Sequence, residues 1–553
     1  MSKNSALKII PLGGLNEIGK NLTVFECEDD IIIVDCGISF PFDNMPGVDL
    51  VIPDMTYLLR NKEKIRAVII THAHEDHIGA VGYLLRQIDV PIYGARLTLG
   101  LLEYRLKEMD LLKSSKLVQV NETTILTIGN FKVEFISVNH SIPDAFAVVI
   151  TSPSGIIVHT GDFKIDYNPV NENVTNLNKF SEVGNRNVLL MLSDSTNAIK
   201  EGHSMSEQSV GESLDSFIRN AKSRILVASF ASNIHRIQQV ITLAEKYKRK
   251  VAIFGFNMRN NIKKAIELGY ISVKQNTLID ENEIKNYKDK EIVFIVTGSQ
   301  GEDNSALSRI AFKKHPKISI EKDDLVIISA SVIPGNEKYL LIVINQLFKN
   351  GAKVIYQGLD EVHASGHAYK QELQLLLSLV RPKYYMPIHG EYMHLKANAD
   401  IAMEMGIKED RIFILENGDV MRIENKKVYI DEKVEAGISL IDGLGMGAMA
   451  DDVIRDRIFM GQGGIINIIA VVDKTSKKLK SEPVIKTNGF VYEDEYKNVI
   501  NIIEKLINIE FEKYQSSNMK VNELQNSIRK RLKSYLYLET RRSPMIIPTI
   551  IEI

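Results

Sequence analysis

Three of the twelve histidines in this chain lie within six positions, in the segment Thr71-His72-Ala73-His74-Glu75-Asp76-His77-Ile78-Gly79. The segment follows the apolar run Ala67–Ile70 and precedes an apolar helical pattern that begins at Ala80. A loop between a strand and a helix is where a rigid scaffold presents functional groups. As a purely structural loop it would gather titratable groups beside a buried strand, which is costly unless something binds them. The segment therefore favours a fold that places such a loop at the edge of a sheet.

The spacing of these side chains indicates a metal site. In an extended stretch His72 and His74 point to the same side, whereas Asp76 and His77 begin the turn into the helix. One loop can therefore offer ligands to two adjacent metal positions. Imidazole nitrogen and carboxylate oxygen suit Zn²⁺ or Mn²⁺.

Two metal ions need further ligands from other parts of the chain. His140, Asp162 and His389 each follow an apolar, strand-like run. Ligands carried by loops are expected at such strand ends. Taken singly, His140 also fits a capped loop histidine, and Asp162 also fits a turn former. His159 lies within a strand and belongs to no motif, so we expect no functional role for it.

Apolar runs and turn signals divide the chain into regions. Roughly the first 200 residues alternate short strands with turns, and many strands are continuously apolar, as in sheets covered on both faces. From about Ser206 helices alternate with buried strands, which is typical of a parallel sheet. From about 360 to 450 short strands return, including Tyr384–Pro387 and Arg411–Leu415. The last region is predicted to be a small α/β unit with a strand at Gly464–Val472 and helices at Glu493–Glu510 and Val521–Leu536.

The composition excludes several classes of protein. Hydrophobic residues make up 44% and charged residues 25% of the chain, which is ordinary for a globular protein. A net charge of −2 excludes a uniformly basic protein but not a local basic groove. The basic cluster within Arg529–Lys533 could contact nucleic acid, although we favour a solvated helix face. The two cysteines, Cys27 and Cys36, are too few for a disulfide scaffold and wrongly spaced for a CxxC motif.

The same features predict where the protein resides. The first ten residues lack the apolar core of a signal peptide. No apolar run approaches the roughly 18 residues that a membrane span needs. With so few cysteines, we expect a cytoplasmic protein without a membrane span.

The motifs together resemble a known family. The H-x-H-x-D-H pattern with a later His and a later Asp resembles the metallo-β-lactamase fold, and the helical insert resembles a β-CASP domain. Over nearly the whole chain the motifs look like the bacterial ribonuclease J family, with Ala73 where that family pattern has Gly. The motifs are Gly13-Gly14-Leu15-Asn16-Glu17-Ile18-Gly19-Lys20-Asn21, Gly161-Asp162-Phe163-Lys164, Asp194-Ser195-Thr196-Asn197, Ser232-Asn233-Ile234-His235-Arg236, His363-Ala364-Ser365-Gly366-His367 and His389-Gly390-Glu391.

This resemblance implies an α/β fold, a metallo-β-lactamase αββα sandwich with an inserted β-CASP α/β domain and a small C-terminal α/β domain. The expected segments are the metallo-β-lactamase domain over 1–205 and 361–450, the β-CASP domain over 206–360, a linker over 451–464 and the C-terminal domain over 465–553.

The resemblance also implies roles for single residues. Asp194 would orient His367 as a catalytic pair, and Asp76 would act in catalysis as well as bind metal; on sequence alone Asp194 fits a helix N-cap equally well. The loop His363-Ala364-Ser365-Gly366-His367 would bind substrate, whereas a plain loop is the alternative. The expected metal ligands are His72, His74 and His140 for one ion, Asp76, His77 and His389 for the other, and Asp162 as the bridge.

A structural Ca²⁺ near Gly47, Asp49 and Asp442 is implied by the same family. Read alone, these two acids are also consistent with surface solvation. The implied cofactors are therefore two Zn²⁺ or Mn²⁺ ions per subunit, with a Ca²⁺ ion besides.

The implied function is hydrolysis of RNA by 5′-to-3′ exonuclease and endonuclease activity, with a preference for a 5′ monophosphate, in RNA maturation and mRNA decay. The implied assembly is a homodimer or homotetramer, alone or with a paralogous subunit or other RNA-decay proteins. A thioester or lactam hydrolase would share the metal loop but not the insert. A DNA-directed β-CASP nuclease fits the same residues. A non-catalytic subunit of an RNA-decay complex would lack some of the metal ligands, whereas this sequence contains all of them.

Overall fold

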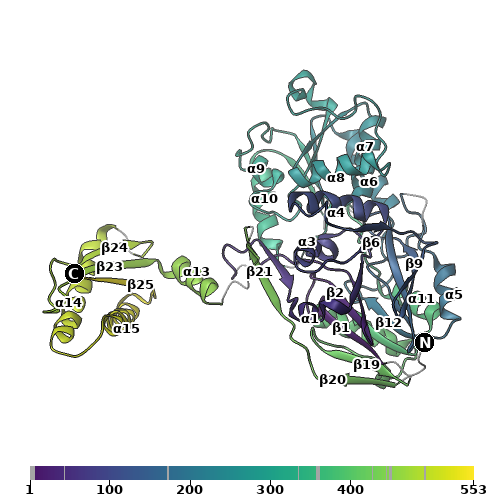
Figure 1. Cartoon of the computed structure of the whole chain (residues 1–553). Helices are drawn as coiled ribbons and strands as arrows, with labels where there is room; N and C mark the ends of the chain where they lie inside the picture. The colour runs from purple at the N-terminus through teal and green to yellow at the C-terminus, as the bar shows by residue number, and fades with distance from the viewer. Residues whose placement is uncertain are drawn as a thin grey trace. The chain divides into compact units, whose positions relative to one another are not determined.

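The computed structural model describes residues 6–42, 44–170, 174–333, 335–356, 362–425, 427–443, 445–446, 451–490 and 493–553 (Figure 1). The chain divides into two compact units, Met1–Ser39 with Ile52–Ile438 and Phe40–Val51 with Ser439–Ile553. The predicted domain boundaries at 360 and 450 lie outside the described residues.

Two sheets packed face to face form the centre of the first unit. Their inner faces share one hydrophobic core, in which Phe25 and Ile69 of one sheet join Val148 and Leu190 of the other. The eight-stranded sheet has the order β20 (Lys427–Asp431), β19 (Val420–Glu424), β1 (Leu7–Gly13), β2 (Leu22–Cys27), β3 (Asp30–Val34), β5 (Ile65–Ile69), β6 (Ile92–Gly94) and β7 (Leu117–Gln119). The six-stranded sheet has the order β18 (Tyr384–Ile388), β12 (Val188–Asp194), β11 (Gly155–His159), β10 (Ala145–Ser152), β9 (Phe131–Val138) and β8 (Ile125–Ile128).

Helices cover the outer faces of this sandwich. Phe180 of α5 and Leu376 of α11 lie in a second core on the outer side of the six-stranded sheet. Such two-sided cover explains the continuous apolar runs of the strands. The helices of this part are α1 (Thr56–Arg60), α2 (Glu75–Ile78), α3 (Val81–Leu85), α4 (Arg96–Glu108), α5 (Leu177–Gly184), α11 (Lys370–Val380) and α12 (Tyr392–Glu404).

One expected strand is wrong. Within Arg411–Leu415 only Ile412 pairs, in an isolated bridge to Tyr385, and a 3₁₀ turn at Glu409–Arg411 precedes it. The apolar run instead packs its side chains, including Phe413 and Leu415, against the core between the sheets. The region from 360 to 450 also contains α11 and α12, which were not expected among its short strands.

The strand directions bring the predicted site residues together. In the six-stranded sheet β11, β12 and β18 are parallel. Strand β9 runs in the same direction, because both β9 and β11 are antiparallel to β10. The carboxyl ends of these four strands therefore meet at one edge, where Asp194 ends β12 and the loops after β9, β11 and β18 carry His140, Asp162 and His389. The carboxyl end of β5 lies beside this edge, since Phe146 N–H donates to Thr71 O at 3.0 Å.

The inserted region is a separate parallel sheet with helices. Its core contains Phe254, Phe294, Ile328 and Leu347. The strands are β14 (Lys250–Phe254), β15 (Ile292–Val296), β13 (Ile225–Ala228), β16 (Leu325–Ile328) and β17 (Lys353–Tyr356), in that order and all parallel. The helices are α6 (Glu207–Asn220), α7 (Ile234–Lys246), α8 (Phe256–Glu267), α9 (Ala306–Ala311) and α10 (Glu337–Lys349).

The second unit contains the C-terminal α/β domain. Helices α14 (Glu493–Gln515) and α15 (Val521–Thr540) pack on one face of a sheet with the order β24 (Val484–Asn488), β23 (Ile465–Val472) and β25 (Met545–Glu552). Strands β21 (Ile438–Asp442) and β22 (Gly445–Met446) form a smaller sheet with β4 (Leu50–Pro53).

The segment 451–464, expected as a linker, forms helix α13 (Asp451–Gly463). The Asp452–Arg455 ion pair of 2.5 Å has the i,i+3 spacing that supports a helix. No helix in the described part of the chain is both long enough and apolar enough to cross a bilayer.

Candidate metal centre

The histidine-rich loop lies between β5 and α2. The chain stays extended through His74, with φ −74° and ψ 151°, and α2 begins at Glu75. His72 and His74 therefore precede the helix, whereas Asp76 and His77 lie within its single turn. Because the backbone changes direction here, one loop contributes ligands to two groups.

The first ligand group consists of His72, His74, His140 and Asp162. His74 Nδ1 lies 3.0 Å from both His72 Nε2 and His140 Nε2. Asp162 Oδ2 lies 3.6 Å from His72 Nε2 and 3.8 Å from His140 Nε2. Nitrogen and oxygen atoms that converge in this way are the donor set of a Zn²⁺ or Mn²⁺ ion.

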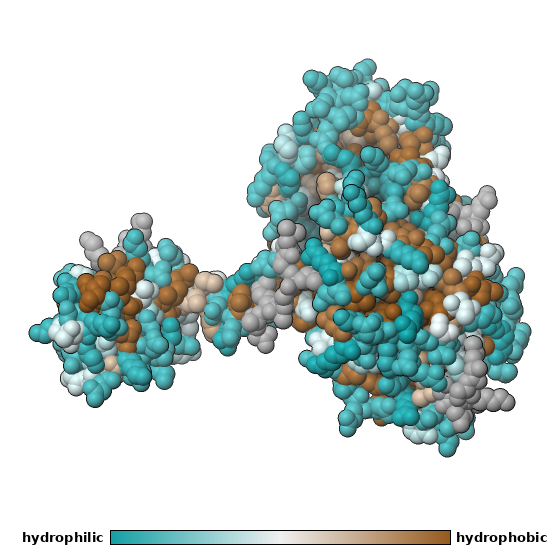
Figure 2. Space-filling view, in the orientation of Figure 1, coloured by the Kyte–Doolittle hydropathy of each residue, from teal (hydrophilic) through white to brown (hydrophobic). Residues whose placement is uncertain are grey.

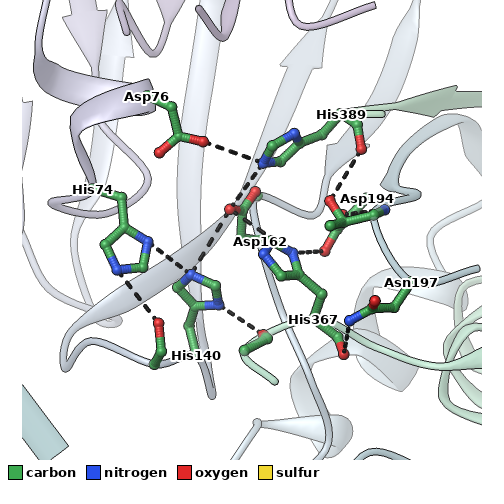
Figure 3. A network of polar contacts seen from close by, with 12 residues as sticks. His74, Asp76, His140, Asp162, Asp194, Asn197, His367 and His389 are labelled. Atoms are coloured by element: carbon green, nitrogen blue, oxygen red, sulfur yellow. Dashed lines mark hydrogen bonds and ion pairs between the residues drawn. The ribbon is translucent and has the colours of Figure 1, made fainter. Parts of the chain in front are cut away.

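The second ligand group consists of Asp76, His77, His389 and the same Asp162. Figure 3 shows Asp76, Asp162 and His389 of this group pointing toward one another. Asp162 Oδ2 lies 3.2 Å from the Nε2 atoms of both His77 and His389. Asp76 Oδ2 lies 3.5 Å from these two nitrogens. A single oxygen, Asp162 Oδ2, thus faces both groups, which is the position of a bridging ligand.

Asp35, which sequence reasoning missed, supports ligands of both groups. Its Oδ2 accepts from His77 Nδ1 at 2.8 Å and from Thr71 Oγ1 at 2.9 Å. Because the Thr71 hydroxyl donates to Asp35, its oxygen accepts from His72 Nδ1 at 3.0 Å. The Nε2 lone pairs of His72 and His77 are therefore left for a metal ion. The available signal was an acidic residue directly after the buried strand β3.

His140 is oriented by the predicted substrate loop. Its Nδ1 donates to Gly366 O at 2.7 Å, which leaves its Nε2 facing the first ligand group. A Cβ atom on Gly366 would lie 2.6 Å from His140 Cε1, so only glycine permits this approach. Gly366 thus has a supporting position beside a proposed ligand.

A third group joins Asp194 and His367 to Asp162 (Figure 3). His367 Nδ1 donates to Asp194 Oδ2 at 2.8 Å and lies 4.0 Å from Asp162 Oδ2. Asn398 holds the Asp194 backbone through a hydrogen bond of 2.9 Å to its carbonyl. Asp194 is fully buried and His367 is partly exposed, so the imidazole can reach a substrate while its orientation is fixed.

The charges of the site favour a cation. Burial lowers the pKa of His72 and of His140, the latter to about 3. Burial acts on His77 and His389 in the same direction, but Asp162 raises their pKa, that of His389 to about 9. Burial likewise opposes ionisation of Asp162, yet His389 and His77 hold its pKa well below the usual range. The neutral imidazoles of His72 and His140 beside the ionised Asp162 suit a metal ion, whereas His77 and His389 would each release a proton on binding one.

His159, for which we expected no functional role, lies beside the second ligand group. His159 Nδ1 accepts from Gly161 N–H at 3.1 Å, and the residue lines a small cavity with His77, Asp162 and His389. It therefore borders the site, which its sequence context did not predict. His363 is half-buried among charged groups, and the loss of solvent around its imidazole lowers its pKa to about 3.

The fold and the site define a class of protein, the metallo-β-lactamase hydrolases with a β-CASP insert. The matching family models are the Metallo-beta-lactamase superfamily over 16–230, the Ribonuclease J beta-CASP domain over 222–347, the Zn-dependent metallo-hydrolase RNA specificity domain over 351–413 and the Ribonuclease J C-terminal domain over 452–553. The predicted fold class is confirmed.

Within this class the chain belongs to the ribonuclease J family. It is 40% identical over 548 residues to Ribonuclease J2 of Bacillus subtilis (strain 168), with 99% of each chain covered. It is 40% identical over 553 residues to Ribonuclease J 1 of Streptococcus pyogenes serotype M3, with 99% of this chain and 98% of that one covered. A crystal structure of a protein of unknown function from Enterococcus faecalis V583 shares the fold, with a TM-score of 0.55, 17% identity, and coverage of 76% of this chain and 100% of that one.

Proposed function

We propose that this chain is a metal-dependent ribonuclease that hydrolyses RNA phosphodiester bonds. The observation that carries the proposal is Asp162 Oδ2, around which two ligand groups and the Asp194–His367 pair converge. The family supports assigning both 5′-to-3′ exonuclease and endonuclease activity, in RNA maturation and mRNA decay. The match to an RNA specificity domain favours RNA over other phosphodiesters.

The two ligand groups fit two Zn²⁺ or Mn²⁺ ions. Bound ions would lower the pKa of an attacking water and neutralise charge on the phosphate. Asp76 is partly exposed, so its carboxylate can also accept a proton from that water. The proposed ligands are His72, His74 and His140 for one ion and Asp76, His77 and His389 for the other, with Asp162 between them.

His367 is the proposed proton donor. Its Nδ1 is engaged by Asp194, so Nε2 is the nitrogen that can face the leaving oxygen. Burial opposes the charged imidazole, but Asp194 raises the pKa of His367 above its usual value. A protonated His367 can therefore donate to the leaving oxygen at neutral pH.

The loop 363–367 is proposed to bind the substrate phosphate. Asn197 Nδ2 donates to Ser365 Oγ at 2.6 Å, and the same oxygen accepts from His367 N–H at 3.2 Å. His363 Nδ1 is a buried atom with no hydrogen-bond partner among the described residues, and the charged groups around the half-buried side chain include Arg236 and Glu207. A fixed hydroxyl and an unengaged ring nitrogen, together with the backbone of Ala364 and Gly366, suit a 5′-monophosphate group.

The proposal is tested by digesting three matched substrates with Zn²⁺ or Mn²⁺ present. These are 5′-monophosphorylated RNA, 5′-triphosphorylated RNA and single-stranded DNA of the same sequence. We expect monophosphorylated RNA to be shortened from its 5′ end faster than triphosphorylated RNA, and internal products to appear from both. Equal or faster cleavage of DNA would indicate a DNA-directed nuclease. No cleavage of any substrate by the metal-loaded protein would indicate a non-catalytic subunit.

We also propose that the chain self-associates through its C-terminal domain as a homodimer or homotetramer. The face of its sheet opposite α14 and α15 exposes Ile469, Val484 and Ile551 by 42%, 51% and 46%. Figure 2 shows hydrophobic surface in the region of β23. Packing this face against a second copy of itself would remove these apolar side chains from water. Within the basic cluster Arg529–Lys533, Arg531 pairs with Glu510 at 3.1 Å, which supports a solvated helix face rather than an RNA site.

The same proposal includes a cytoplasmic location and an assignment of domains. The metallo-β-lactamase domain is assigned to 1–205 and 361–450, the β-CASP domain to 206–360 and the C-terminal domain to 465–553. A paralogous subunit or other RNA-decay proteins are further proposed partners. Complexes of mixed composition are to be sought by mass spectrometry of the purified particle.

A further inference from the structure

Arg457 of α13 lies where the family resemblance implies a calcium ion. Its Nη2 donates to Asp442 Oδ2 at 2.5 Å. Its Nη1 donates to Gly47 O at 3.0 Å and to Pro46 O at 3.2 Å. All of these residues belong to the second compact unit. The guanidinium thus joins three segments that are far apart in the sequence: the turn at 46–47, the end of β21, and α13.

The backbone is shaped to accept this guanidinium. Gly47 has a φ of +73°, and a Cβ atom built on it would lie 2.6 Å from Arg457 Nη1. A side chain at position 47 would therefore be strained and would also displace Arg457. The absence of a side chain at Gly47 is explained by the close approach of the arginine.

Asp49, the third residue of the implied calcium site, is also engaged. Its Oδ2 accepts from Gly443 N–H at 2.7 Å, and its own N–H donates to Ile441 O at 2.8 Å. This carboxylate closes the turn after β21. The expected residues do come together, but Asp442 and the Gly47 carbonyl bind a side chain and Asp49 binds the backbone.

These contacts do not fit a calcium ion. Ca²⁺ requires six to eight oxygen ligands at about 2.3–2.6 Å. Here the Asp442 carboxylate and the carbonyls of Pro46 and Gly47 already face a permanent cation with five N–H donors. We propose that the Arg457 guanidinium is the built-in cation of this site and that it clamps α13 to β21 and the turn at 46–47 without a divalent ion.

The proposal predicts that divalent ions bind around Asp162 but are not needed to close the clamp. Removal of metal should empty the ligand groups around Asp162 but leave the clamp closed. Hydrogen–deuterium exchange of the full-length protein can show this, because it reports locally and does not require two-state unfolding. Peptides that contain Val48, Asp49 and Gly443 are the reporters, since their amide hydrogen bonds lie in the clamp.

The experiment compares wild type, Arg457→Ala and Arg455→Ala, each with Ca²⁺ and with EGTA. Arg455 lies on the same helix and, among the described residues, pairs locally with Asp452, so it is the matched control. We expect wild-type exchange in the reporter peptides to be equal with Ca²⁺ and with EGTA. Arg457→Ala should increase their exchange severalfold, and Arg455→Ala should not.

Two results would overturn the proposal. The first is slower exchange of the wild-type reporter peptides with Ca²⁺ than with EGTA, because an ion would then be bound in preference to the arginine. The second is an Arg457→Ala variant whose reporter peptides exchange as slowly as those of Arg455→Ala.

Discussion

At the scale of single residues, Asp194 determines the chemical role of His367. The carboxylate is buried and binds His367 Nδ1, so it fixes the tautomer and stabilises the imidazolium. We predict that His367→Ala slows the chemical step by about 10²–10⁴-fold, the usual range for a general acid. Asp194→Asn should act in the same direction but more mildly. Single-turnover hydrolysis of labelled RNA measures both effects.

Metal content must be measured on the same samples. We expect both variants to keep their ions, because neither residue belongs to the first two ligand groups. His203→Ala, an exposed histidine outside the site, is the control and should retain the wild-type rate. Loss of metal from His367→Ala or Asp194→Asn would place these residues in the coordination shell and contradict the assigned role.

Asp35 orients ligands of both groups through hydrogen bonds. We predict that Asp35→Asn weakens metal binding by about 10–100-fold, the usual cost of removing an acid that orients ligand histidines. The affected ligands are His77, through a direct hydrogen bond, and His72, through Thr71. Competition with a fluorescent chelator measures the affinity. Asp110→Asn is a matched control, because Asp110 is exposed and shares the left-handed backbone conformation of Asp35; equal affinities in the two variants would contradict this role.

Whether a site residue could be predicted from the sequence depends on whether it belongs to a local sequence pattern. His72, His74, Asp76 and His77 form a local pattern, so their convergence follows from strand and helix geometry alone. Asp35 belongs to no pattern, because its importance arises from a contact with His77, which lies 42 positions away. Such contacts are set by the order of strands in the sheet.

At the scale of elements, a buried ion pair holds the inserted domain together. Arg236 of α7 donates to Glu207 Oε2 of α6 at 2.6 Å, and both residues are fully buried. Arg236 also donates to Val362 O at 2.6 Å. The pair therefore links two helices to the start of the proposed substrate loop.

We predict that Glu207→Gln destabilises this region by about 3–5 kcal/mol, because it leaves a buried guanidinium without its counter-charge. Burial opposes ionisation of Glu207, but Arg236 holds its pKa below the usual value. The stabilisation should be full above the unfolded pKa of about 4.3 and lost as the pH falls through the lower folded pKa. Hydrogen exchange of α6 and α7 peptides measures it. Glu212→Gln, an exposed position on α6, should match wild type, and equal exchange in the two variants would contradict the prediction.

Elements were predictable where one periodicity dominated. Strand β9 was expected at Phe131–Val138, as observed, because its apolar run is bounded by turns. The run at Arg411–Leu415 is likewise mostly apolar but packs without a neighbouring strand, and only the tertiary fold decides this. Helix α13 was not predicted, because its segment is highly charged. The contact between Arg457 and Gly47 that anchors the helix spans 410 positions and leaves no local pattern in the sequence.

At the scale of the whole molecule, we predict that truncation at Met460 reduces the particle to a smaller species while the ligand groups keep their metal. The physical reason is loss of the apolar face of β23, β24 and β25. Light scattering gives the mass per particle. Ile469→Lys should have the same effect, because it places a charge in the centre of that face, whereas Glu512→Lys on α14 should not. Truncated protein with an unchanged mass per particle would refute the assembly role.

The central claim is that two metal ions held around Asp162 hydrolyse RNA. The most direct measurement titrates metal-free protein with Mn²⁺ or Zn²⁺ and records bound metal per chain and RNA hydrolysis on the same samples, for wild type, His74→Ala and Asp76→Ala. We predict that wild-type hydrolysis appears as the second ion binds. Both variants should bind less metal and lose hydrolysis while their circular dichroism stays that of wild type. A variant that cleaves RNA at the full rate with its ligand groups empty would contradict the two-metal account.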